Sequence, residues 1–163
     1  MKKCLFTLGL ILFTVFVSEA VVLADEPVGV KLEKECWDAR ASYEKGKMRE
    51  FPKEVKKEFI GCTGVRKKYW CVSDATIVLT FKVNGLVEGD VYQIVNQFWK
   101  KGASVKGRAY ENGSLLLKET RDKTSPFYKY EFRGTYKDGV ISGLWQKGAE
   151  DQFLFWVEHK ESK

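Results

Sequence analysis

The chain has 163 residues, of which 44% are hydrophobic and 31% charged, and its formal net charge is +6. This length suits one domain of ordinary size with its own core, and it excludes an array of several domains. The cations are spread along the chain, which is more typical of a solvated face than of a nucleic-acid site, so we expect no nucleic-acid partner. A basic surface does favour peripheral contact with an anionic membrane or glycan.

Residues 1–24 have the pattern of a cleaved secretory signal peptide. Two lysines precede an apolar stretch, 4–17, and acidic residues follow Ala24 directly. A membrane anchor is the alternative, but charge follows the apolar stretch at once. We therefore predict a periplasmic or secreted protein whose mature chain, 25–163, folds as a single domain without a transmembrane segment.

The stretch 25–72 is predicted to hold one or two short helices and loops. Its first part has apolar residues at helical spacing: Leu32, Cys36, Ala39 and Tyr43. Pro52 is expected to open a second helix in which Val55 and Phe59 share a face. We expect these helices to pack over one end of a sheet or along its wall.

Three cysteines remain after the signal peptide. In an oxidising compartment the short separation of Cys62 and Cys71 favours a disulfide between them. Cys36 is then buried as a small apolar side chain, bridges two chains, or is the true partner of one of the others. Zinc is the metal alternative, but the single histidine, His159, is distant and no Cys-x-x-Cys pair exists. We expect no metal and no cofactor.

The loop between the paired cysteines is a candidate surface interaction site. It carries three cations and two aromatic residues: Arg66, Lys67, Lys68, Tyr69 and Trp70. Such a loop suits an anionic headgroup, a glycan phosphate or an acidic protein patch. The alternative is a stapled loop whose aromatic side chains fold back onto the protein.

From Ala75 onward the hydrophobic period changes to two, the period of a β-strand. The pattern predicts strands at 75–83, 91–100, 103–110 and 114–120. Asn-Gly dipeptides at 84–85 and 112–113 supply turns, and Gly102 is expected to end a strand.

The last third of the chain has the strongest hairpin signal. Alternating aromatic and polar residues at 128–136 and 140–145 flank an Asp-Gly dipeptide at 138–139, and another aromatic strand follows at 152–159. About seven strands joined by short turns make a meander over 73–160. A meander of this size avoids exposed edges by curling, so we predict a mainly β fold, an antiparallel up-and-down barrel that is closed or nearly closed.

Two resemblances accompany this pattern. The glycine-aromatic stretch 132–145 and the strand to Trp156 resemble the closing hairpins of lipocalin-like and avidin-like barrels, which implies a lipocalin-like architecture. Tyr69-Trp70-Cys71, the stretch 107–110 and the stretch 145–150 resemble pieces of the C-type lysozyme inhibitors of bacterial envelopes. That second resemblance implies an inhibitor that acts through its surface.

Aromatic residues on the alternating faces are expected to line the barrel interior. The candidate wall comprises Phe81, Tyr92, Phe98, Tyr128, Tyr130, Phe132, Tyr136, Trp145, Phe153 and Phe155. Such a wall suits a small apolar or amphipathic ligand, with tyrosine hydroxyls as directional contacts. The alternative is a filled barrel that binds an envelope protein, as an interaction module or inhibitor.

No catalytic motif is present, and we expect a protein that is not an enzyme. His159 lies near the end of the last predicted strand and is expected to be an exposed terminal histidine, and no Gly-x-Ser-x-Gly elbow exists. An enzyme would instead need carboxylates that converge, for which the candidates are Glu111, Glu119, Glu131, Asp151 and Glu158.

Overall fold

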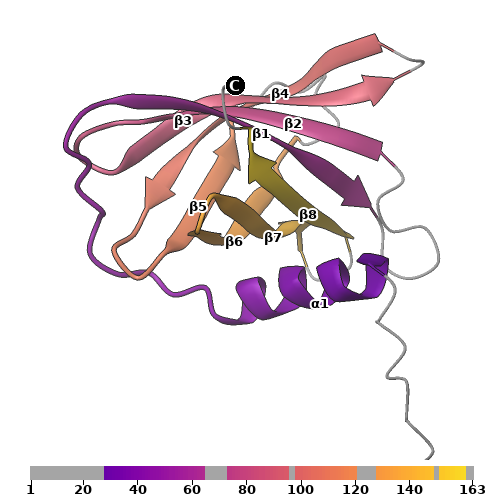
Figure 1. The fold of residues 1–163 in the computed structure, drawn as a ribbon, viewed down its shortest axis with the longest axis horizontal. Helices are drawn as coiled ribbons and strands as arrows, with labels where there is room; N and C mark the ends of the chain where they lie inside the picture. Colours follow the sequence, from indigo (N-terminus) through magenta and orange to yellow (C-terminus); the bar gives the residue numbers. More distant parts are fainter. Residues whose placement is uncertain (1–27, 65–72, 96–97, 121–127, 149–150, 161–163) are drawn as a thin grey trace, which may run out of the picture.

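The structure is a computed structural model that describes residues 28–64, 73–95, 98–120, 128–148 and 151–160. These ranges form one helix and eight strands (Figure 1): α1 (Val28–Ala41), β1 (Val55–Gly64), β2 (Ser73–Phe81), β3 (Leu86–Val95), β4 (Phe98–Ala109), β5 (Ser114–Glu119), β6 (Glu131–Lys137), β7 (Val140–Lys147) and β8 (Asp151–His159).

The strands form a closed barrel in which each strand pairs antiparallel with the next one along the chain. The strand β8 pairs back with β1, from Phe59 opposite His159 to Gly64 opposite Leu154. The predicted mainly β, up-and-down barrel is therefore confirmed. It has eight strands among the described residues, where the sequence pattern predicts about seven.

The additional strand is β1, which replaces the second helix predicted from Pro52. Val55 and Phe59 are four residues apart, a spacing that puts them on one face of either a helix or a strand. In the structure Phe59 faces the core while Lys56 and Glu58 are exposed, the alternation of a strand. The barrel thus begins at Val55, inside the stretch 25–72 that was predicted to be helices and loops.

The predicted strand 91–100 is also wrong, because it spans the end of β3 and the start of β4. Gly102 does not end a strand. The pairing passes from Val91 opposite Ala103 to Tyr92 opposite Lys101, so Gly102 is the extra residue of a β-bulge within β4.

Three short turns meet at one end of the barrel, which we call the mouth. They are the predicted Asn-Gly and Asp-Gly turns, with positive φ at Gly85, Gly113, Asp138 and Gly139. Glycine and aspartate tolerate this left-handed conformation, which explains why these dipeptides connect the strands. The first residues of β1 and the last of β8 lie at the same end.

Large apolar side chains fill the space between the strands. Those at most 1% exposed include Phe59, Ile77, Leu79, Phe81, Leu115, Leu117, Phe132, Ile141, Trp145 and Phe155. Each comes from the inward face of its strand, as the period of two predicts. The inward-facing residues Phe81, Phe132, Trp145 and Phe155 were predicted to face this interior.

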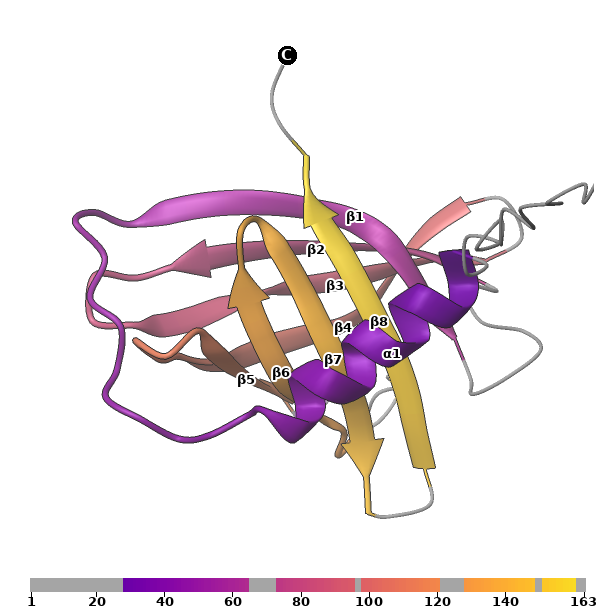
Figure 2. The same ribbon diagram turned by 60° about the horizontal axis from the view of Figure 1, so that its bottom comes forward.

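The helix α1 packs along the outer wall of the barrel, across β6, β7 and β8 (Figure 2). Cys36 and Trp37 contact Leu144, Leu154 and Trp156, which point outward from the strands and form a second apolar cluster. Arg40 and Glu35 fix the helix further, through hydrogen bonds to Gln146 and to Trp156. No helix in the described ranges is long and apolar enough to cross a bilayer.

Of the three alternatives predicted for Cys36, the structure has the first, a buried small apolar side chain. Its thiol is free and fully buried between α1 and the wall, and it donates a hydrogen bond to the carbonyl oxygen of Phe155 at 3.2 Å. Burial is the main cause that raises the pKa of this thiol from 9.0 to about 12. Cys36 is therefore a packing residue in the folded protein.

Candidate functional site at the barrel mouth

The chain between α1 and β1 runs past the mouth and is hydrogen-bonded to its turns. Arg49 donates its backbone N–H to the carbonyl oxygen of Ala109, and Phe51 donates to that of Val83, at 2.9 and 3.0 Å. Further along, Glu111 donates to the carbonyl oxygen of Lys47 at 3.0 Å. These bonds fix the residues of an otherwise irregular segment at definite positions over the barrel.

Aromatic rings close the barrel beneath this segment. Tyr136 stacks on Phe81 with 4.9 Å between ring centroids, and its ring meets Phe59 edge-on at 5.6 Å. Phe51 reaches in from the segment and lies 5.3 Å from Phe81. His159 at the end of β8 meets Phe59 edge-on at 5.6 Å. We call Phe51, Phe59, Phe81, Tyr136 and His159 the mouth cluster.

Two cations lie beside the mouth cluster. The guanidinium carbon of Arg49 is 5.1 Å from the ring centre of Phe51 and 6.0 Å from that of Tyr136. Lys57 donates a hydrogen bond from Nζ to the Tyr136 hydroxyl at 3.0 Å and lies 5.8 Å from its ring centre. A cation over the face of an aromatic ring is attracted to it, so the rings of Phe51 and Tyr136 help to hold the charge of Arg49, whereas Lys57 is held by its hydrogen bond to the Tyr136 hydroxyl.

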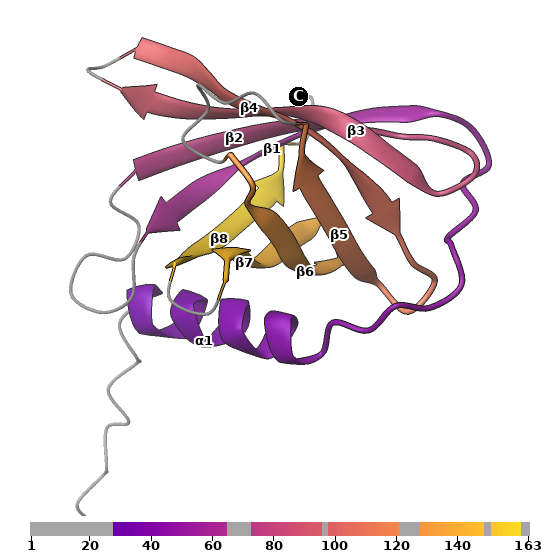
Figure 3. The same ribbon diagram turned by 180° about the vertical axis from the view of Figure 1, so that it is seen from behind.

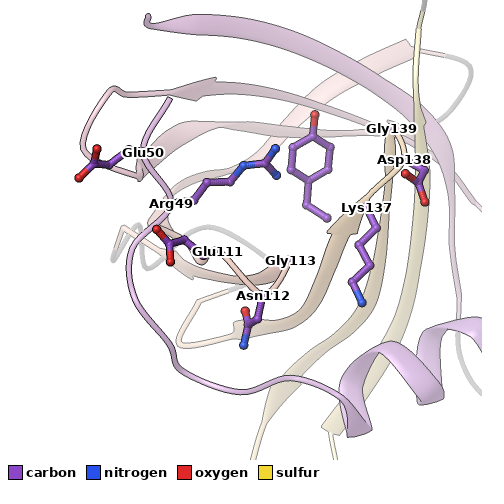
Figure 4. A pocket seen from close by; sticks show the side chains of 9 residues that line it. Arg49, Glu50, Glu111, Asn112, Gly113, Lys137, Asp138 and Gly139 are labelled. Atoms are coloured by element: carbon purple, nitrogen blue, oxygen red, sulfur yellow. The ribbon is translucent and has the colours of Figure 1, made fainter. Parts of the chain in front are cut away.

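A pocket of about 590 Å³ opens beside Arg49 (Figure 4). It is lined by the segment and by two of the turns, through Arg49, Glu50, Glu111, Asn112, Gly113, Tyr136, Lys137, Asp138 and Gly139. Tyr136 donates its backbone N–H to Gly113, and His159 donates to Gly139, both at 2.8 Å. The turns that line the pocket are thus tied to the neighbouring strands.

Side chains of both charges line this pocket. Glu111 forms an ion pair with Lys47 at 2.9 Å. Glu50 and Arg49 are consecutive, and Figure 4 shows their side chains pointing to opposite sides. Within the described part of the chain, no carboxylate forms an ion pair with Arg49 or Lys137. The pocket therefore has two cations without an ion-pair partner, and the carboxylates of Glu50 and Asp138, which also line it, form no ion pair among the described residues either.

The residues predicted to line a ligand cavity lie mostly in the core. Phe81, Tyr130, Phe132, Tyr136, Trp145 and Phe155 are buried, and Phe153 packs against them. Tyr92 and Tyr128 are half-buried and lie outside this core cluster, and Phe98 is in β4 but its side chain lies outside the described set.

The deeper aromatic residues contact one another. Phe132 lies 5.5 Å from Trp145 and 5.9 Å from Phe155, centroid to centroid, and Trp145 and Phe155 are 6.1 Å apart. Tyr130 and Phe153 form another pair at 5.4 Å. The predicted wall is therefore, in this part of the barrel, a set of rings in mutual contact with edge-on or tilted planes, as in a filled core.

Sequence reasoning missed most of the mouth. His159 is half-buried against Phe59 and is not the exposed terminal residue that was expected. Arg49, Phe51 and Lys57 were not singled out, because the segment 42–54 has no periodicity and Lys57 was assigned to a helix. The nearest signals were Phe81 and Tyr136, which the strand alternation placed inside.

The candidate surface loop 66–70 and Cys71 lie outside the described residues. The side chain of Cys62 is buried in β1. Its pairing with Cys71 and the role of the loop stay predictions.

The carboxylates proposed for an enzyme do not form a cluster that the structure describes. Glu111 is at the mouth, bound to Lys47, whereas Glu131 begins β6 at the opposite end and pairs with Lys118. Among the described residues, no three of the His, Cys, Asp and Glu side chains are grouped so that they could hold a metal ion.

Comparisons of the chain with models of protein families, with curated proteins and with solved structures found no match. The functional argument for this barrel therefore rests on the geometry of the mouth.

Proposed function

We propose that the protein is an exported barrel that binds, without a reaction, a small amphipathic ligand carrying an anionic group. The observation that carries this proposal is Arg49, whose guanidinium lies over the Tyr136 ring in the mouth pocket and has no described ion-pair partner. A guanidinium binds a carboxylate, sulfonate or phosphate with two parallel hydrogen bonds. The apolar part of the ligand would then lie against Phe51 and Tyr136.

This proposal moves the ligand from the barrel interior to its mouth. Deep in the barrel the predicted wall residues pack against one another, whereas at the mouth aromatic rings and unpaired cations border a pocket. Ligand sites commonly combine an apolar surface with a few polar groups that fix orientation. The signal peptide at 1–24 and the periplasmic or secreted location belong to the same proposal.

The first test uses 8-anilinonaphthalene-1-sulfonate, an anionic aromatic probe that becomes fluorescent when bound. We expect saturable binding to the folded wild-type protein and about tenfold weaker binding to Arg49→Gln, because a charge-assisted contact is lost. The neutral probe N-phenyl-1-naphthylamine should bind both proteins equally, since it lacks the sulfonate.

The matched control is Lys34→Gln, which removes an exposed cation from α1, away from the mouth. Its affinity for the sulfonate should equal that of the wild-type protein. Equal weakening by both substitutions would attribute the effect to net charge and contradict a site at Arg49. Absence of binding by the wild-type protein would contradict it as well.

A filled barrel that acts through its surface, as an envelope interaction module or inhibitor, is the second candidate. The packed rings Phe132, Trp145 and Phe155 favour it. Native mass spectrometry of the unreduced protein from its host separates the two. A bound small molecule that is lost on denaturation supports the ligand proposal, and a bare protein mass supports the surface proposal.

A further inference from the structure

The outer face of β4 and β5 carries a groove that is separate from the mouth pocket. It has a volume of about 470 Å³ and is lined by Lys45, Leu86, Lys106, Gly107, Arg108, Tyr110, Leu116, Lys118, Glu119 and Thr120. Figure 3, which views the molecule from behind, shows the strands β3, β4 and β5 that form this face. Four of the lining side chains are cationic.

Strand register brings these cations together. Lys106 of β4 lies directly opposite Lys118 of β5, and Arg108 is two residues further along β4 on the same face. Like charges directly opposite one another on neighbouring strands repel and destabilise the pair. A bound anion would relieve this repulsion, so the groove is suited to a negatively charged partner.

Carboxylates on the two flanking strands lie beside this pair of lysines. Lys118 forms an ion pair with Glu131 at 2.7 Å. Glu88 of β3 lies directly opposite Lys106, and its carboxylate is bound to Lys82 at 2.8 Å. Among the described residues, no carboxylate forms an ion pair with Lys45, Lys106 or Arg108.

Apolar side chains accompany the cations. Leu86 is 40% exposed at the start of β3, directly opposite Arg108, and Leu116 lies opposite Arg108 on the other side. Tyr110 forms the adjoining wall, where its ring meets Tyr43 edge-on. An exposed leucine beside a row of cations suits a partner that has both carboxylates and apolar side chains.

We infer that this groove is a docking site for an acidic segment of a partner protein. Carboxylates of the segment bind Lys106 and Arg108, and an apolar side chain of the segment covers Leu86. The exposed leucine favours a peptide over a sulfated glycan or a lipid headgroup, which would use the cations alone. The proposal is independent of ligand binding at the mouth.

The experiment measures fluorescence anisotropy of a labelled nine-residue peptide made of three Glu-Leu-Glu units. A peptide of three Glu-Ser-Glu units has the same charge and tests the apolar contact. We expect the wild-type protein to bind the leucine peptide more tightly, and Lys106→Gln/Arg108→Gln to bind it at least about tenfold more weakly. Leu86→Ser should make the affinities for the two peptides equal.

The control Lys31→Gln/Lys34→Gln removes two exposed charges from α1 and should change the affinity less than twofold. Arg49→Gln should also leave it unchanged, which separates this groove from the mouth. An equal loss of affinity for the leucine peptide in Lys106→Gln/Arg108→Gln and in Lys31→Gln/Lys34→Gln would overturn the proposal. So would equal binding of both peptides together with full competition by heparin, which would identify a general polyanion surface. Thermal unfolding by circular dichroism verifies that each variant folds.

Discussion

The carboxylate of Glu131 lies between cations from its own and a neighbouring strand. It forms ion pairs with Lys118, at 2.7 Å, and with Arg133. Partial burial opposes ionisation, but the hydrogen bonds from these two cations outweigh it, so the pKa of Glu131 lies below its ordinary value of 4.5. Because the folded-state pKa is depressed, the interaction stabilises the fold above pH 4.5 and is lost as the pH falls through the folded-state pKa.

Glu131→Gln should lower the free energy of unfolding by about 0.5–1 kcal/mol at pH 7, a modest value because the cations are partly exposed. Urea unfolding at pH 7 and at pH 3 measures the difference between the two proteins. It should shrink at the lower pH, because the unfolded wild-type chain takes up a proton at Glu131 more readily than the folded protein does. A difference that stays constant between the two pH values would show that Glu131 acts through packing.

The burial of a single residue was predictable from sequence where the alternation of a strand determines whether its side chain faces the core. Phe132 and Trp145 belong to strands of clear period two, and both lie in the core as the pattern predicts. Arg49 and Phe51 belong to an irregular segment, and hydrogen bonds to Ala109 and Val83, far away in the sequence, set their positions. The sequence around Arg49 and Phe51 does not indicate which distant residues these two bond to.

Among the elements, α1 forms a second apolar layer outside the barrel. Its buried residues Cys36 and Ala39 were predicted to share an apolar stripe, and of the two predicted placements, over one end of the barrel or along its wall, the structure has the second. The Cys36 thiol is enclosed between the helix and β8. Access to this sulfur therefore reports whether α1 stays bound to the wall.

We predict that Cys36 in the unreduced mature protein reacts with Ellman's reagent at pH 8 about a thousandfold more slowly than in urea. The thiol pKa of about 12, against 9.0 in the ordinary state, lowers the thiolate fraction by that factor, and burial slows the reaction further. Absorbance at 412 nm (the colour of the released thiolate) follows the reaction.

The control for this reaction is Lys34→Cys on a Cys36→Ala background, which puts a thiol on an exposed position of the same helix. It should react at the rate of a free thiol. A wild-type rate close to that of this control would mean that α1 detaches readily from the barrel.

The strand β1 shows why one element was assigned wrongly. The stretch 53–60, which includes its first half, is rich in lysine and glutamate, and Val55 and Phe59 are compatible with both periods. Pairing with β2 on one side and β8 on the other determines the strand. Because those partners are distant in sequence, the tertiary contacts override a local preference for helix.

For the molecule as a whole, the contact between β1 and β8 closes the barrel and removes both sheet edges. Gly61 lies opposite Val157 at this closure. A Cβ atom on Gly61 would lie 2.7 Å from the Cα of Val157 and would overlap the backbone of Trp156. The missing side chain is what allows the first and last strands to come so close.

Gly61→Ala should therefore destabilise the protein by about 2–3 kcal/mol and promote association through the released strand edges. Thermal unfolding and size-exclusion chromatography with light scattering measure the two effects. Gly46→Ala is the matched control, because a Cβ there would make ordinary contacts at 3.5 Å with Asn112. A Gly61→Ala protein as stable and monomeric as the control would show that the closure is not tight.

Along much of their length β7 and β8 are covered on both faces, by the barrel core on the inside and by α1 on the outside. Leu144 and Trp145 are neighbours in sequence yet belong to different apolar layers, as do Leu154 and Phe155. Adding or deleting one residue in either strand would exchange the two layers and send a tryptophan or phenylalanine toward the helix. An inserted tag or grafted sequence would therefore disturb the two apolar layers at any position within these strands. An insertion in the turns at the mouth would shift neither layer.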